Sequence, residues 1–213
     1  MTRQRSSRSP ATSRAAASRR GKLRIIGGDY RRRQLPIPDL PGLRPTPDRV
    51  RETLFNWLGQ TLYGQRALDL FAGTGALGIE ALSRGCREAL FVERETKASA
   101  QLTANLASLG AHNAQVQTQD ALRFLATEPT ERFDLVFLDP PFHQDLAAPC
   151  CEALELGGWL ADDALIYLEV EATLIPTVPS HWQLYRETRA GESSARLYRR
   201  QTPSTAQTAL AAE

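Results

Sequence analysis

The stretch FDLVFLDPPF, residues 133–142, combines a strand with an unusual end. Its first six residues are typical of a buried strand, and its last four are Asp139, Pro140, Pro141 and Phe142. A strand that merely stopped would more often end in Gly, Asn or Ser. The prolines restrict the backbone around the carboxylate, so hydrogen-bond acceptors would be held in place before a ligand arrives. The stretch therefore indicates a binding or catalytic site.

A glycine-rich turn lies upstream, where LDLFAGTGALGIEAL passes from a strand into a helix. Glycines let the backbone approach a ligand closely, and the first turn of a helix offers unpaired N–H groups to an anion. Glu93 ends the next predicted strand, where its carboxylate can accept both hydroxyls of a ribose. This pattern alone also fits a dinucleotide, so it leaves NAD and other nucleoside cofactors open. The candidate cofactor-binding residues of the turn are Phe71, Ala72, Gly73, Thr74, Gly75 and Gly78.

Asp69, inside the strand before this turn, favours one class of cofactor. A carboxylate at that depth costs free energy unless a partner satisfies it, and dinucleotide strands are normally apolar there. Asp69 can help to hold the amino group of S-adenosylmethionine, directly or by fixing the loop, whereas NAD and FAD have no such ammonium. Asp120 follows the third predicted strand, where it can take an adenine amino group while the N–H of Ala121 meets a ring nitrogen. Asp120 also has the position of a helix N-cap.

The patterns that must position these residues alternate between strand and helix. Such alternation predicts an α/β fold with a mostly parallel sheet and helices on both faces, because each parallel neighbour needs a crossover. Ligands of these sheets lie beyond the carboxyl ends of the strands, where Gly73, Glu93, Asp120 and Asp139 all fall. The strands are predicted at 67–71, 89–93, 114–119, 133–139 and 164–170, and the helices at 76–84, 95–109, 121–127 and 144–156.

Two hairpins flank this pattern. Residues 22–26 and 30–38 form a small N-terminal β-hairpin around a Gly-Gly turn, and 182–191 pairs with 194–200 as an antiparallel edge hairpin, since no helix separates them. After the first hairpin, Thr46 is predicted to cap a helix that starts at Pro47 and ends at Gly59.

The charge of the chain is concentrated at its front. Residues 1–35 contain eleven Lys or Arg and one acid, a balance of +10, so the net charge of +2 leaves −8 for the remainder. A basic front end favours a polyanionic partner, because phosphate contacts release counterions, although residues 1–20 can also be a solvated tail. We expect a disordered basic tail at 1–21, a hairpin extension at 22–45, the main domain at 46–200 and a disordered tail at 201–213.

Several classes of protein are disfavoured by the sequence. No run of about 18 apolar residues and no apolar signal core is present, so we expect a cytoplasmic protein. Cys86, Cys150 and Cys151 fit neither a disulfide framework nor a paired metal site, and we expect them to be buried. The three histidines show no ligand spacing, so we expect no metal.

The motifs DLFAGTGALGIEAL, FVERE, QDAL and DPPF together resemble the class I S-adenosylmethionine-dependent methyltransferases, which have a seven-stranded Rossmann-like sheet. DPPF is similar to the signature of the subgroup that methylates exocyclic amino groups. The segment LRIIGGDYRRRQLPIPDLPGLRPTPDRVRETLFNWL is similar to the opening of the RsmD family, bacterial methyltransferases for a guanine N2 in 16S ribosomal RNA. The similarity runs from about Lys22 to Arg200.

The resemblance implies roles for the motif residues. The Asp139 carboxylate and the Pro140 carbonyl would accept the two N–H groups of the guanine amine, whose lone pair then faces the methyl group, while Phe142 stacks on the base. Arg44 and Thr46 would help to close the cofactor site. The partner would be 16S ribosomal RNA in the small subunit or an assembly intermediate, and we expect a monomer. The implied RNA-binding residues are Lys22, Arg24, Arg31, Arg32, Arg33, Arg49 and Arg51.

Alternatives remain open at this stage. Arg49, Arg51 and Glu52 can instead form pairs on a helix surface. Related motifs serve DNA adenine and protein glutamine methyltransferases, but the chain has no room for a target-recognition domain, and a glutamine enzyme more typically has Asn in place of Asp139. An RNA-binding module with an inactive cofactor pocket and a nicotinamide oxidoreductase are the other candidates.

Overall fold

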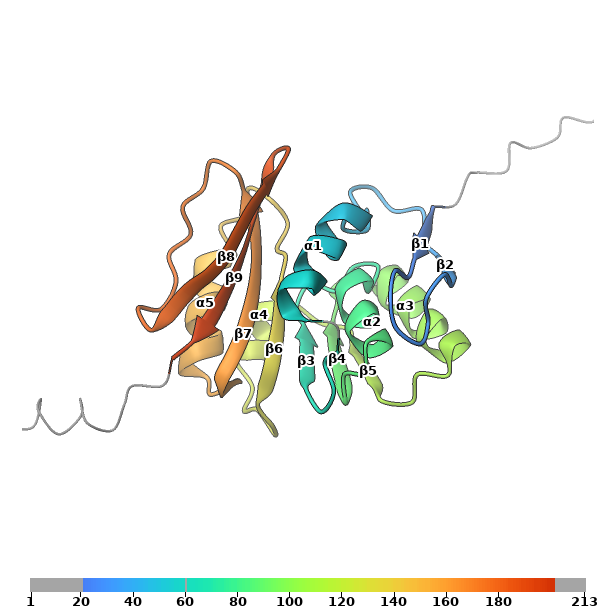
Figure 1. Ribbon diagram of the computed structural model, residues 1–213, viewed down its shortest axis with the longest axis horizontal. Coiled ribbons are helices and arrows are strands. Elements are labelled where there is room, and N and C mark those ends of the chain that lie inside the picture. The colour runs from blue at the N-terminus through green and yellow to red at the C-terminus, as the bar shows by residue number, and fades with distance from the viewer. Residues whose placement is uncertain (1–20, 60, 202–213) are drawn as a thin grey trace, which may run out of the picture.

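The computed structural model describes residues 21–59 and 61–201, which form a seven-stranded sheet with helices on both faces (Figure 1). The first five strands of its spatial order run parallel, whereas β9 is antiparallel to both of its neighbours. The predicted α/β fold with an antiparallel edge hairpin is confirmed. In spatial order the strands are β5 (Ala114–Gln117), β4 (Glu88–Val92), β3 (Arg66–Asp69), β6 (Phe133–Leu138), β7 (Leu160–Glu171), β9 (Ser193–Arg200) and β8 (Trp182–Ala190).

Each face of the sheet has its own apolar core, because successive side chains of a strand point to opposite faces. Leu135 and Phe137 of β6 pack with one cluster, and Val136 and Leu138 with the other. Figure 1 shows α1 and α2 in front of the strands and α4 and α5 behind them. The helices are α1 (Asp48–Leu58), α2 (Ala76–Ser83), α3 (Thr96–Leu109), α4 (Ala121–Leu125) and α5 (Ala147–Leu156).

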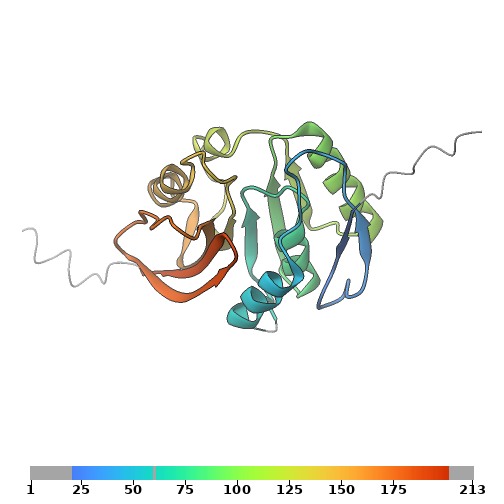
Figure 2. The same ribbon diagram turned by 90° about the horizontal axis from the view of Figure 1, so that it is seen from above.

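The strand order reverses at β3, which lies between β4 and β6. In sheets of this kind, ligands bind at the point of reversal, beyond the carboxyl ends of the strands. Figure 2, seen from above, shows α4 and α5 on one side of the strands and α1 and α2 on the other. The glycine-rich turn after β3 and the DPPF motif after β6 therefore meet at this edge.

Some predicted boundaries are wrong. Pro47, not Thr46, is the N-cap of α1, and no side chain caps that helix. Helix α5 begins at Ala147 instead of 144, because His143 (φ 61°) and Asp145 (φ 52°) adopt left-handed conformations that a helix cannot contain.

The small N-terminal hairpin pairs β1 (Lys22–Arg24) with β2 (Gln34–Pro36), and residues 25–33 connect them, a longer connection than the predicted Gly-Gly turn. Gly28 (φ 71°) lies so close to α2 that a Cβ atom there would be 1.6 Å from the Ser83 carbonyl oxygen. Leu23 and Leu35 of the hairpin are buried in the same cluster as α2 and α3. The hairpin therefore packs onto the sheet domain. The boundaries at 45 and 46 stay a prediction, and the tail segments 1–20 and 202–213 lie outside the described residues.

The surroundings of Arg51 contradict its predicted role in RNA binding. Its side chain is 1% exposed and donates to Asp48 at 2.6 Å and to Glu80 at 3.4 Å, so it cannot meet an RNA phosphate. Fully buried Glu80 also accepts the backbone N–H groups of Ile26 and Gly27 at 2.9 and 2.8 Å. This buried network joins the hairpin, α1 and α2, and the prediction that Arg51 binds RNA is wrong.

Candidate active site

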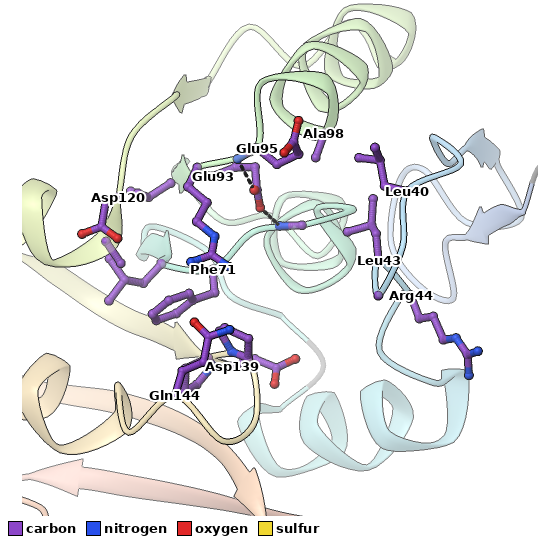
Figure 3. Close-up of a pocket in the computed structure, with 18 of the residues that line it drawn as sticks. Leu40, Leu43, Arg44, Phe71, Glu93, Glu95, Ala98, Asp120, Asp139 and Gln144 are labelled. Atoms are coloured by element: carbon purple, nitrogen blue, oxygen red, sulfur yellow. Dashed lines mark hydrogen bonds between the residues drawn. The ribbon is translucent and has the colours of Figure 1, made fainter.

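Glu93 holds the glycine-rich turn to the end of β4. Its Oε2 accepts the backbone N–H of Gly73, and its Oε1 accepts that of Glu95, each at 2.7 Å (Figure 3). A carboxylate oxygen has a second lone pair, so Glu93 can still accept hydroxyl groups of a ligand. The structure thus brings together Gly73 and Glu93, as the sequence predicts.

Two further glycines bring α2 close to the strands. Gly75 has a φ of 77°, a left-handed conformation that glycine adopts without strain. A Cβ atom on Gly78 would lie 2.3 Å from the Phe91 ring and 3.1 Å from Asp69 Oδ2, so only glycine fits there. The Gly78 N–H donates to Asp69 Oδ2 at 2.9 Å. Asp69 therefore anchors the first turn of α2, directly after the glycine-rich turn, and its role toward a cofactor stays a prediction.

A cavity of about 550 Å³ opens at the carboxyl ends of β3, β4 and β6. Figure 3 shows Leu40, Leu43 and Arg44 of the N-terminal segment on one side of it and Asp120 and Asp139 on the other. The sequence-predicted residues that line it are Arg44, Phe71, Gly73, Glu93, Asp120, Ala121, Asp139, Pro140, Pro141 and Phe142.

A smaller cavity of about 40 Å³ adjoins the first, since Arg44, Phe71, Gly73 and Asp139 line both. Two carboxylates face it, from Asp69 and Asp139. This arrangement can take a cationic group beside the larger cavity. The predicted residues that line the smaller cavity alone are Thr46, Asp69, Ala72 and Thr74.

Asp69 is 3% exposed, and its surroundings favour the neutral acid. Burial raises the pKa of Asp69 from 3.8 to about 7, with a smaller rise from the charge of Glu93, while the hydrogen bond from Gly78 acts in the opposite direction. Within the described part of the chain, no cation contributes to this pKa. A bound ammonium group would therefore stabilise the charged form of the Asp69 carboxylate.

Asp69→Asn should remove a pH dependence of stability. The pKa of Asp69 is higher in the folded chain, so its contribution to stability is complete only below the ordinary pKa of 3.8 and is lost as the pH rises to about 7. The stability of the variant relative to the wild type should therefore increase by about 4 kcal/mol between pH 4 and pH 8, since one pKa unit equals about 1.4 kcal/mol. Urea unfolding over this range measures the difference. Parallel curves for the two proteins would show that Asp69 does not titrate as described, and exposed Asp163→Asn is the control.

Asp120 has both of its predicted positions. Its Oδ1 accepts the N–H groups of Leu122 and Arg123 at 3.0 and 3.1 Å, which confirms the N-cap of α4. The same residue lines the larger cavity next to Ala121. One oxygen thus anchors the helix, and the other can face a ligand.

Asp139 follows β6 and is half-buried. Burial, followed by the charges of Glu169 and Asp69, raises its pKa well above the ordinary value. Figure 3 shows the Asp139 carboxylate directed away from Gln144, toward the side on which Arg44 lies. Pro140 is buried, whereas Phe142 is 36% exposed, and both line the larger cavity. The motif thus presents a carboxylate and an accessible aromatic face at the larger cavity.

Comparison with known proteins places this site in a family. A family model described as "Conserved hypothetical protein 95" matches residues 23–199. The ribosomal RNA small subunit methyltransferase D of Escherichia coli K12 is 52% identical over 182 residues, which are 85% of this chain and 91% of that protein. The chain belongs to the RsmD family.

Solved structures related to RsmD share the architecture. A putative methyltransferase from Escherichia coli superposes with a TM-score of 0.79 at 51% identity, over 86% of this chain and all of that one. A putative methylase from Haemophilus influenzae gives a TM-score of 0.75 at 40% identity, over 85% of this chain and all of that one. The chain is therefore similar to methyltransferases along most of its length.

The basic residues of this RsmD-family chain differ in their surroundings. Arg24 is paired with Asp48 at 2.6 Å but stays 55% exposed, and Arg33 donates to the Ser108 carbonyl at 3.0 Å. Whether the exposed basic residues contact RNA stays a prediction. Those that the structure leaves exposed are Lys22, Arg24, Arg31, Arg32, Arg33 and Arg49.

Sequence reasoning missed part of the RsmD site. Leu40 and Leu43 line the larger cavity from the segment after the hairpin, and Gln144 lines it beyond the DPPF motif. The only available signal was the Pro-Gly turn between the two leucines, because nothing in an irregular segment reveals which cavity it covers.

Within residues 21–59 and 61–201, no helix has the length and apolar character needed to cross a membrane, and no His, Cys, Asp and Glu cluster could hold a metal.

Proposed function

We propose that this protein transfers a methyl group from S-adenosylmethionine to the exocyclic N2 amine of a specific guanine in 16S ribosomal RNA. The single observation that carries the proposal is the position of Asp139 and Pro140, which line the cavity that the glycine-rich turn, Glu93 and Asp120 also line. The 52% identity to a ribosomal RNA small subunit methyltransferase D supports the RNA substrate. The protein would act as a monomer in the cytoplasm, on small ribosomal subunits or their assembly intermediates.

The two cavities fit the parts of this cofactor. Asp120 and Ala121 would hold the adenine, and Glu93 would accept the ribose hydroxyls. Asp69 would lie near the ammonium group, while Arg44 and Thr46 would close the smaller cavity. The bound cofactor supplies an electrophilic methyl group on a sulfonium.

The chain's contribution to the reaction is to prepare the amine. The lone pair of a guanine N2 is delocalised into the ring, so the nitrogen is a poor nucleophile. Acceptance of its two N–H groups by the Asp139 carboxylate and the Pro140 carbonyl favours a tetrahedral nitrogen with its lone pair free. Both acceptors are fixed by the proline backbone, and Phe142 can stack on the base. The methylated amine is acidic enough to release its proton to water or to a weak carboxylate.

Reversing the charges of Arg31, Arg32 and Arg33 to Glu should weaken binding of the subunit. All three are exposed on the connection between β1 and β2, so each can meet a phosphate. The apparent KM for the subunit should rise, and the slope of log KM against log salt should fall by up to about three, one for each lost phosphate contact. An unchanged slope would remove these arginines from the RNA interface. Charge reversal at exposed Arg123 is the matched control.

The class of substrate can be tested with labelled methyl donor. The protein would be incubated with unmodified small ribosomal subunits, free 16S RNA, duplex DNA and total protein, and S-adenosylmethionine and NAD would be titrated separately. We expect label in the ribosomal RNA and binding of S-adenosylmethionine. Label in DNA or protein would favour the alternative amine methyltransferases, and RNA retention without binding of S-adenosylmethionine would favour an inactive RNA-binding module.

A further inference from the structure

Glu169 is a buried carboxylate of β7 to which the proposed reaction gives no role. Its side chain is 7% exposed, and the hydroxyl of fully buried Tyr167 donates to its Oε2 at 2.6 Å. Within residues 21–59 and 61–201, its other oxygen, Oε1, accepts no hydrogen bond, and no Lys, Arg or His forms an ion pair with it. Because Oε1 is not among the buried unpaired atoms of the described residues, it keeps contact with solvent and can meet a donor from a ligand.

The register of the sheet places Glu169 next to Asp139. Phe137 pairs with Tyr167 and Leu138 with Leu168 in the parallel ladder of β6 and β7, so Asp139 and Glu169 occupy the next position of the two strands. Alternation along each strand gives them the same face as Phe137 and Tyr167, the face that α1 covers. The two carboxylates also interact electrostatically, because the charge of Glu169 is the second cause of the raised pKa of Asp139.

Purines differ in whether the ring nitrogen N1, next to the reacting amine, carries a hydrogen. In guanine, the N2 amine lies beside N1–H, so the Watson–Crick edge presents adjacent donors. Adenine has an N1 lone pair beside its amine, and 2-aminopurine has the same 2-amine as guanine but no hydrogen on N1. A second carboxylate beside the acceptor of the amine therefore matches guanine and repels the other two bases.

We propose that Glu169 accepts the N1–H of the target guanine through Oε1 and thereby selects guanine, while Asp139 and Pro140 accept the N2 amine. Tyr167 is the positioning residue, since its hydroxyl occupies Oε2 and leaves Oε1 for the base. This inference rests on the proposed function, because it requires a guanine whose amine lies at Asp139.

The test compares guanine with 2-aminopurine at the target position. Small subunits would be reconstituted from ligated 16S RNA that carries either base, and kcat/KM would be measured for the wild type, Glu169→Gln and the control Glu152→Gln on the exposed side of α5. Wild type and control should prefer guanine by roughly 10- to 100-fold, the discrimination of one well-placed base contact. In Glu169→Gln the preference should shrink to near unity, because the amide can donate to the bare N1.

The outcomes separate this inference from the proposed function. A wild type that uses the two bases equally overturns the role of Glu169 without any variant, so a folding defect cannot hide the result. A preference that survives in Glu169→Gln also overturns it, since O6 of guanine would then be the feature that is recognised. If the wild type does not methylate even the subunits that carry guanine, the proposed function itself is rejected. Thermal unfolding and S-adenosylmethionine binding of Glu169→Gln show whether that variant is folded.

Discussion

Replacing Asp139 with alanine should lower the rate constant of methyl transfer by roughly 1000-fold, the upper range for removal of one preorganised polar group from an active site. The substitution deletes an acceptor that makes its stronger contact as the amine becomes tetrahedral, so the effect falls on kcat. Most of the affinity for S-adenosylmethionine should remain, because Glu93, Asp120 and the glycine-rich turn line the cavity independently of Asp139. Single-turnover methylation at saturating cofactor, together with calorimetric titration of the cofactor, measures the two quantities.

Asp139→Asn is the matched variant for this prediction. The amide keeps one acceptor oxygen and its size, so its rate should lie between those of the wild type and the alanine variant. Full activity of Asp139→Ala would remove the carboxylate from the mechanism. An equal loss of cofactor binding and rate would mean that Asp139 serves the cofactor instead of the amine.

Replacing Glu93 with alanine should have the second largest effect, a rise of about 100-fold in the Kd for S-adenosylmethionine. The variant loses the acceptor for the ribose hydroxyls and also the two hydrogen bonds that hold Gly73 and Glu95, both at 2.7 Å. Because these contacts do not change as the methyl group moves, kcat at saturating cofactor should change far less than the Kd. Equilibrium binding and kcat measured on the same preparation test this separation.

Glu93→Gln is the control for the loss of charge alone. Its carbonyl oxygen can keep one of the two backbone hydrogen bonds, so its Kd should rise by less than that of the alanine variant. A Kd that is unchanged in Glu93→Ala would show that the ribose is held elsewhere. A collapse of kcat at saturating cofactor would assign Glu93 to the reaction itself.

Strand ends were the most predictable part of this protein. Gly73, Glu93, Asp120 and Asp139 share the property that each lies at or just after the end of a predicted strand, and the rule for parallel sheets then brings them to one edge. The structure places all four around the larger cavity. Local pattern and a general rule of topology were enough, because no information about distant partners was needed.

Long-range partners could not be predicted in the same way. Arg51 occupies a helix position that is equally typical of a surface pair. Only the packing of α1 against α2 reveals that Arg51 forms an ion pair with buried Glu80. The one available signal was a lone glutamate within the apolar sequence ALGIEALS, which becomes meaningful once Ile26 and Gly27 are seen to donate to it. Glu169 escaped notice for the same reason, since its meaning depends on the register between β6 and β7.

The most direct test of the account is the identity of the methylated nucleoside. Unmodified small ribosomal subunits would be incubated with the protein and labelled S-adenosylmethionine, the 16S RNA would be digested completely, and the labelled nucleoside would be identified by mass and chromatography. The account predicts N2-methylguanosine from one position of the RNA. Label in methyladenosine, in a ring-methylated guanosine, or in no nucleoside would contradict it.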